Sequence, residues 1–172
     1  IANFYNQVEG AVYSSDGYNP ITHKHFSEYI DLKSFAKYYL IQELLMHCDA
    51  GNNSFMMYKD IDSKDSLLHT GPIWDFDLYV RDVNPWNVLY VSAFYGKSGG
   101  IYYHLWQHGE FRDSVANIYK TELYPVLRNI LHSNYLDSLQ HVLNVQIPEF
   151  TESVEKRSEF LYWLFTTDSS DI

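Results

Sequence analysis

The sequence predicts an α+β domain that is mostly helical and contains one β-hairpin. Apolar residues recur at helical spacing over residues 1–15, 31–47 and from 101 onward, whereas two short strand-like runs at 54–59 and 67–70 flank a polar turn. The chain has 172 residues, 46% of them hydrophobic, so it can bury roughly 70% of the surface that its unfolded form exposes. We therefore expect one domain spanning residues 1–172.

The first half of the chain is organised around one long helix. A helix over residues 1–15 comes first, followed by turn signals at 16–20. Asp31 is a suitable N-cap for a helix that ends near His47, and this helix is apolar on nearly all sides. A helix of that kind lies in the middle of a domain. Glu43 falls inside its apolar stripe, so we expect this carboxylate to be buried and hydrogen-bonded.

Turn and helix-breaking residues mark the boundaries of the remaining predicted elements. The predicted hairpin has its turn at residues 62–65, and Gly71-Pro72 ends its second strand. Residues 82–100 look irregular because they contain Asn-Pro and Gly-Gly signals. The last part of the chain is helical, with segments at 101–108, 110–131 with a kink or break at Pro125, 134–145 and 148–165.

Composition excludes some classes of partner. The formal net charge is −10, which argues against binding to nucleic acid or to an anionic membrane surface. No apolar run approaches the roughly 18 residues of a membrane span. The single cysteine, Cys48, cannot form an intrachain disulfide. The chain shows no signal peptide and begins with Ile1 rather than Met, so we expect it to be a piece of a longer protein.

The central segment contains two loops whose aspartates are candidates for a catalytic site. The long helix leads into a loop containing His47-Cys48-Asp49, the hairpin follows, and the next loop contains Asp75 and Asp77. Asp49 and Asp75 are separated by 75 − 49 = 26 residues. Because a hairpin returns the chain to its starting point, we expect Asp49 and Asp75 within about 10 Å of each other.

This order of elements is that of a protein-kinase C-lobe, in which a His-x-Asp catalytic loop, a hairpin and an Asp-Phe metal loop follow one another. The chemistry explains the pattern. An acceptor hydroxyl needs one carboxylate to orient it and take its proton. The phosphates of ATP need Mg²⁺, a hard cation that prefers oxygen ligands, and a second carboxylate holds it.

Three spaced motifs make the resemblance more specific. Asp31 to Leu44, then Asp49 with Ser54 to Asp60, then Gly71-Pro72-Ile73-Trp74-Asp75-Phe76-Asp77-Leu78 resemble the CotH kinase (spore coat protein H-like) family. The resemblance covers about residues 20–80 strongly and is looser after residue 100.

The resemblance implies a secreted or cell-surface kinase that uses ATP and Mg²⁺ or Mn²⁺ to phosphorylate Ser or Thr of a secreted or envelope protein. It implies that Asp49 is the catalytic base and Asp75 a metal ligand. The phosphate-anchoring N-lobe of the family would lie upstream of Ile1, so no nucleotide-binding residues can be assigned here.

The chain departs from the family pattern at one metal position. Five residues after the catalytic Asp the family often has Asn, whereas this chain has Ser54. A serine hydroxyl is a shorter oxygen donor, so a metal would be held more weakly. Ser54 and Asp77 are therefore lesser candidates for the metal shell beside Asp75.

Two other functions remain open. A kinase-like scaffold can serve as a non-catalytic surface or assembly module, which the serine at position 54 and the 17% aromatic content favour slightly. A carbohydrate-active enzyme, which also uses paired carboxylates, is the third alternative.

Several further residues have simpler structural interpretations. We expect Trp74 to pack in the core, Cys48 to be an inert packed thiol, and Asp60-x-Asp62-x-x-Asp65 to be a polar turn rather than a calcium loop. His104 and His108 have the i, i+4 spacing of a zinc pair, but no third ligand is evident.

Overall fold

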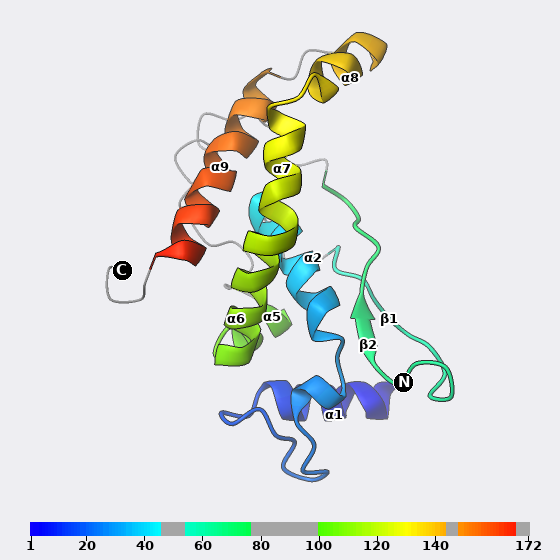
Figure 1. Cartoon of the computed structure of the whole chain (residues 1–172). Helices are drawn as coiled ribbons and strands as arrows, with labels where there is room; N and C mark the ends of the chain where they lie inside the picture. Colours follow the sequence, from blue (N-terminus) through cyan, green and yellow to red (C-terminus); the bar gives the residue numbers. More distant parts are fainter. Residues whose placement is uncertain (46–53, 77–99, 144–147, 168–172) are drawn as a thin grey trace.

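The computed structural model describes residues 1–45, 54–76, 100–143 and 148–167 (Figure 1). The chain is mostly helical and contains one antiparallel pair of strands, as predicted. The helices before the hairpin are α1 (Ala2–Val12), the 3₁₀ turn Phe26–Glu28 and α2 (Leu32–Leu44); those after it are α5 (Gly100–Leu105), α6 (Gly109–Ile118), α7 (Tyr124–Leu131), α8 (Tyr135–Leu143) and α9 (Pro148–Thr166).

Helix α2 is the central element (Figure 1). Asp31 caps it as predicted, because its carboxylate accepts a hydrogen bond from the Ser34 amide at 3.0 Å. Eight of its side chains are buried, on more than one side of the helix: Phe35, Ala36, Tyr38, Tyr39, Leu40, Gln42, Glu43 and Leu44. The prediction of a helix enclosed by the domain is confirmed.

Aromatic rings form much of the core around α2. Tyr102 of α5 is fully buried and donates to the Phe35 carbonyl oxygen at 3.1 Å. Tyr39 stacks on Trp106, with ring centroids 5.1 Å apart, and meets Phe111 edge-on at 5.8 Å. Such contacts stabilise by more than their buried area alone. They join α2 to α5 and α6.

The hairpin is shorter than the sequence suggested. Strand β1 (Met57–Lys59) pairs with β2 (Leu68–Thr70) in the register Met57↔Thr70. The first three residues of the predicted strand, 54–56, lie before β1, and the left-handed backbone of Ser54 is incompatible with a strand at the first of these positions. Backbone hydrogen bonds from Leu68 to Tyr29 and from Asp31 to Leu68 attach β2 to the chain just before α2.

The helix predicted over 110–131 keeps one direction, but its winding changes from α to π and back to α just before Pro125. A π-helical turn, Tyr119–Leu123, joins α6 to α7, and Pro125 lies in the first turn of α7. Proline lacks an amide hydrogen and its ring crowds the carbonyl four residues earlier. The wider π turn accommodates both effects, so the predicted break is a local change of winding instead.

None of the described helices is both long enough and apolar enough to cross a bilayer.

Candidate functional site

The hairpin brings two of the predicted metal residues together. Ser54, ahead of β1, donates from Oγ to Oδ2 of Asp75, beyond β2, at 2.8 Å. These residues are 21 positions apart in sequence. The exposed Asp75 carboxylate therefore lies at the open end of the hairpin beside a hydroxyl oxygen.

Both residues adopt a backbone conformation that is rare outside glycine. Ser54 has φ of 51° and Asp75 has φ of 63°, which places each in the left-handed region. Such a conformation costs on the order of 1–3 kcal/mol per residue and persists only where the surroundings enforce it. Strained positions cluster at functional sites, so the backbone makes Ser54 and Asp75 candidates for one.

Tyr38 of α2 contacts both the segment that carries Ser54 and the segment that leads to Asp75. Its hydroxyl lies 3.4 Å from the Ser54 carbonyl oxygen and 3.5 Å from that of Pro72. These are long contacts, so the packing of its ring against Phe55, at 5.3 Å between centroids, is the firmer attachment. Burial raises the pKa of Tyr38, which keeps the hydroxyl protonated as a donor.

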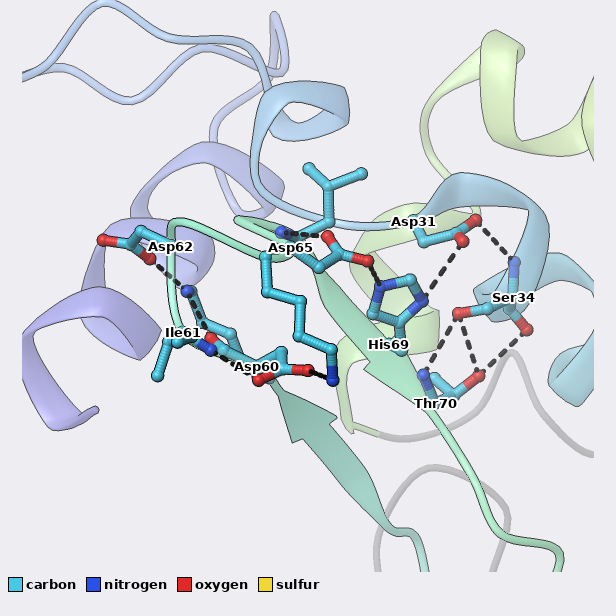
Figure 2. A network of polar contacts seen from close by, with 11 residues as sticks. Asp31, Ser34, Asp60, Ile61, Asp62, Asp65, His69 and Thr70 are labelled. Atoms are coloured by element: carbon cyan, nitrogen blue, oxygen red, sulfur yellow. Dashed lines mark hydrogen bonds and ion pairs between the residues drawn. The ribbon is translucent and has the colours of Figure 1, made fainter.

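The N-terminal end of α2 holds the second strand of the hairpin (Figure 2). Ser34 Oγ accepts from the Thr70 amide at 3.1 Å, and Thr70 Oγ1 donates to the Ser34 carbonyl oxygen at 2.9 Å. His69 lies between two carboxylates: Nδ1 is 3.1 Å from Asp31 and Nε2 is 2.8 Å from Asp65. A ring placed in this way donates to both carboxylates only when it is protonated. The arrangement fixes β2 against α2.

The acidic turn of the hairpin is structural, as predicted. Lys59 pairs with Asp62, and Lys64 pairs with Asp60. The Leu67 amide, with a smaller contribution from His69, lowers the pKa of Asp65. These carboxylates are matched by cations and amides of the same turn, so they do not form a calcium loop.

Glu43 confirms the expectation for the buried carboxylate. It is 0% exposed, and its Oε2 lies 2.7 Å from Nη2 of Arg157 in α9, which is also 0% exposed. Burial and, to a smaller extent, the nearby Glu43 charge raise the pKa of Tyr39 one turn earlier. The pair lies at the C-terminal end of α2.

The two histidines of α5 and its following turn have separate structural contacts. Nε2 of the buried His108 lies 2.9 Å from the Val12 carbonyl oxygen, and His104 stacks on Tyr13 at 3.8 Å. Over residues 1–45, 54–76, 100–143 and 148–167, no group of three or more His, Cys, Asp or Glu residues could hold a metal. The zinc interpretation therefore has no support.

Trp74 contradicts its prediction. It is 56% exposed and directly precedes Asp75. The coil at 71–76 continues past the end of β2 (Figure 1), and Trp74 lies in this coil, next in sequence to Asp75.

The other two predicted site residues, Asp49 and Asp77, lie outside the described residues, as does Cys48. The predicted separation of Asp49 and Asp75 is therefore untested. The structure brings together Ser54 and Asp75.

The donor set of this pair suits a hard divalent cation. It consists of a carboxylate and a hydroxyl that donates its hydrogen to Asp75 and can still accept through its lone pairs. Mg²⁺ is usually held by one or two carboxylates, with waters and substrate phosphates completing its shell. Ser54 and Asp75 thus fit part of such a shell.

Sequence reasoning missed three supporting residues. Tyr38 looked like one more apolar position of the helix, and its hydroxyl was the only available signal. Arg157 gave no signal, because its partner is 114 residues away. His69 follows an apolar pair in a strand, and its contact with Asp31, far away in the sequence, is not visible in spacing.

Comparison with known proteins supports the kinase resemblance. Searches of curated proteins and of solved structures each found no match. The model of the family described as CotH kinase protein matches residues 1–169. Because this match covers nearly the whole chain, the chain belongs to the CotH kinase family.

Proposed function

We propose that this chain supplies the C-lobe half of a phosphotransfer site. The activity is ATP- and divalent-metal-dependent phosphorylation of Ser or Thr in a secreted or envelope protein, at an extracellular or cell-surface location. The observation that supports the proposal is the 2.8 Å contact between Ser54 and Asp75, because both residues would belong to one metal shell in the kinase pattern.

The residues have distinct roles in this proposal. Asp75 holds Mg²⁺ or Mn²⁺ through its carboxylate, Ser54 orients that carboxylate and offers a second oxygen, and Asp77 is a lesser candidate ligand. Asp49 orients the acceptor hydroxyl and takes its proton. The bound metal neutralises charge on the phosphates. The site also needs groups that align the phosphates of the nucleotide.

A phosphate-transfer assay tests this proposal. The full-length protein is incubated with radiolabelled ATP, Mn²⁺ or Mg²⁺ and several acceptor proteins, beside Asp75→Asn and Asp49→Asn. We expect activity only in the unaltered protein. Asp75→Asn loses metal-dependent nucleotide binding, whereas Asp49→Asn retains it. An inactive full-length protein with no metal-dependent ATP binding would overturn the catalytic proposal.

The alternative is a non-catalytic surface or assembly module on the same scaffold. The specific observation in its favour is that Ser54 stands where the family often has Asn, and its shorter side chain would hold a metal more weakly. A thermal-shift measurement separates the two functions: a kinase is stabilised by nucleotide only when metal is present, whereas the module shows no such shift.

A further inference from the structure

A cavity lies between α2 and the helix that runs from α6 through the π turn into α7. Its volume is about 380 Å³, which falls within the range of roughly 300–1,000 Å³ that is usual for small-molecule sites. It is more than twice the roughly 150 Å³ of an engineered cavity that binds benzene. None of the described residues that line it belongs to the pair of Ser54 and Asp75, so the phosphotransfer function does not account for this cavity.

The walls of the cavity are aliphatic. They include one residue from α2, one from the end of α6, one from the π turn and one from α7, namely Ile41, Ile118, Leu123 and Val126. Val126 is 53% exposed, so the cavity opens to the surface beside α7. None of the described residues that line it is aromatic, although aromatic rings form much of the core. Nucleobases are commonly held by stacking on aromatic rings, and these walls suit an alkyl chain instead.

The π turn forms one side of the cavity. Its hydrogen bonds span five residues instead of four, and turns of this kind inside α-helices are frequent at functional sites. Here the π turn places two consecutive residues, Glu122 and Leu123, on the same cavity. Leu123 adds to the aliphatic wall, whereas the Glu122 carboxylate binds lysines of α2. The change of winding therefore gives the cavity an apolar side chain and a charged one at adjacent positions.

The charged side chains at the cavity sum to one positive charge. Lys37, which lines the cavity, lies 2.7 Å from one oxygen of Glu122, and Lys33, one turn earlier on α2, lies 2.8 Å from the other. Within the described part of the chain, neither lysine has a second acidic partner. Hydrogen bonds from the two lysines lower the pKa of Glu122, so this carboxylate stays ionised. In a chain of net charge −10, a local positive excess favours an anionic ligand.

We propose that this cavity binds a free amphiphile that joins an alkyl chain to a carboxylate, which is the chemistry of a fatty acid. The carboxylate lies at the ammonium groups of Lys33 and Lys37, and the alkyl chain occupies the aliphatic space between the helices. An ammonium group has three donors, so both lysines can bind the ligand while keeping Glu122. The net charge of the chain disfavours an anionic membrane surface, and the ligand is therefore a free molecule. This inference does not depend on the proposed phosphotransfer function.

Isothermal titration calorimetry with decanoate, below the concentration at which decanoate forms micelles, tests the site. We expect saturable binding of one decanoate per chain. The affinity should fall about fourfold for each methylene group removed, in a series from decanoate through octanoate to hexanoate, because each buried methylene contributes about that factor. Decyltrimethylammonium, which combines the same alkyl chain with a cation, should bind far more weakly than decanoate.

Two variants and a matched control locate the ligand. Val126→Trp fills the cavity from a half-exposed position, so it should abolish decanoate binding while the melting temperature stays close to that of the unaltered protein. Lys37→Gln removes one ammonium group and should weaken binding on the order of tenfold, as for the loss of a hydrogen bond between charged groups. Lys156→Gln removes a lysine from another exposed ion pair, with Glu152 on α9, and should leave the affinity unchanged.

Several results would overturn this inference. The first is the absence of saturable decanoate binding in the unaltered protein. Binding that persists in Val126→Trp, or that falls equally in Lys37→Gln and Lys156→Gln, would place decanoate elsewhere on the surface. Binding to phosphatidylglycerol vesicles without binding of free decanoate would indicate a membrane contact instead. None of these measurements uses ATP, so their outcome is separate from that of the phosphate-transfer assay.

Discussion

Replacing Arg157 with methionine should destabilise the fold by about 3–5 kcal/mol. The structure sets this magnitude, because both Arg157 and Glu43 are 0% exposed and water cannot screen the charge that remains. The variant also removes the donor to the Glu43 carbonyl oxygen. For a domain whose total stability is on the order of 5–15 kcal/mol, this is a third or more of the free energy of unfolding.

A double variant provides the decisive comparison. Glu43→Leu combined with Arg157→Met replaces the pair with apolar side chains, and its stability should return to within about 1 kcal/mol of the unaltered protein or exceed it. The difference between the double variant and the two single variants then measures the coupling between the residues. The exposed pair of Arg128 and Glu159 is the control, and Arg128→Met should change stability by about 1 kcal/mol or less.

The assay is urea unfolding at equilibrium, followed by tryptophan fluorescence and repeated by circular dichroism. Coincident transitions would justify a two-state treatment. A loss of less than about 1 kcal/mol in Arg157→Met would refute the reasoning, because it would place the guanidinium in a solvated environment rather than a buried one.

Three further outcomes follow from single sites. Ser54→Asn should increase Mn²⁺ affinity, because asparagine tolerates the left-handed backbone and its side chain carries an oxygen donor that reaches farther. Electron paramagnetic resonance measures the Mn²⁺ affinity, and weaker binding would contradict a role of position 54 in holding the metal. The pKa of Asp65 is lowered chiefly by the Leu67 amide, so the contribution of this carboxylate to the free energy of unfolding is complete above its ordinary pKa of 3.8. That contribution is lost as the pH falls through the lower pKa of the folded state, and a carboxyl-carbon NMR titration that follows the ordinary pKa would disprove this contact. Gln42 is 0% exposed and neither amide atom has a hydrogen-bond partner within the described part of the chain, so Gln42→Met should raise the melting temperature; a lower one would indicate that the amide is paired through bound water.

Local features were predictable from the sequence because their causes are local. The Asp31 cap, the phase of α2 that buries Glu43, and the polar turn of the hairpin all follow from residues within one or two turns of chain. The pairing of Ser54 with Asp75 was also foreseeable, since the hairpin between them sets their approach.

Features that depend on tertiary contacts were not predictable. The partner of Glu43 comes from α9, and no spacing rule connects residues 114 positions apart. Trp74 is exposed although tryptophan is usually buried, because its position depends on where the coil after β2 leads. Pro125 indicated a disturbance of the helix, but it could not show that a π turn would absorb it.

The contacts of α2 explain how the segments carrying Ser54 and Asp75 are held in a fixed position. Asp31 and Ser34 hold the hairpin at its first turn, and Tyr38 supports the segments that carry Ser54 and Asp75 near its middle. Arg157 holds its last turn. A helix of 13 residues spans roughly 20 Å and transmits displacement rigidly along its axis. The hairpin, Ser54 and Asp75 are therefore attached to one rigid helix, which α9 holds at its other end.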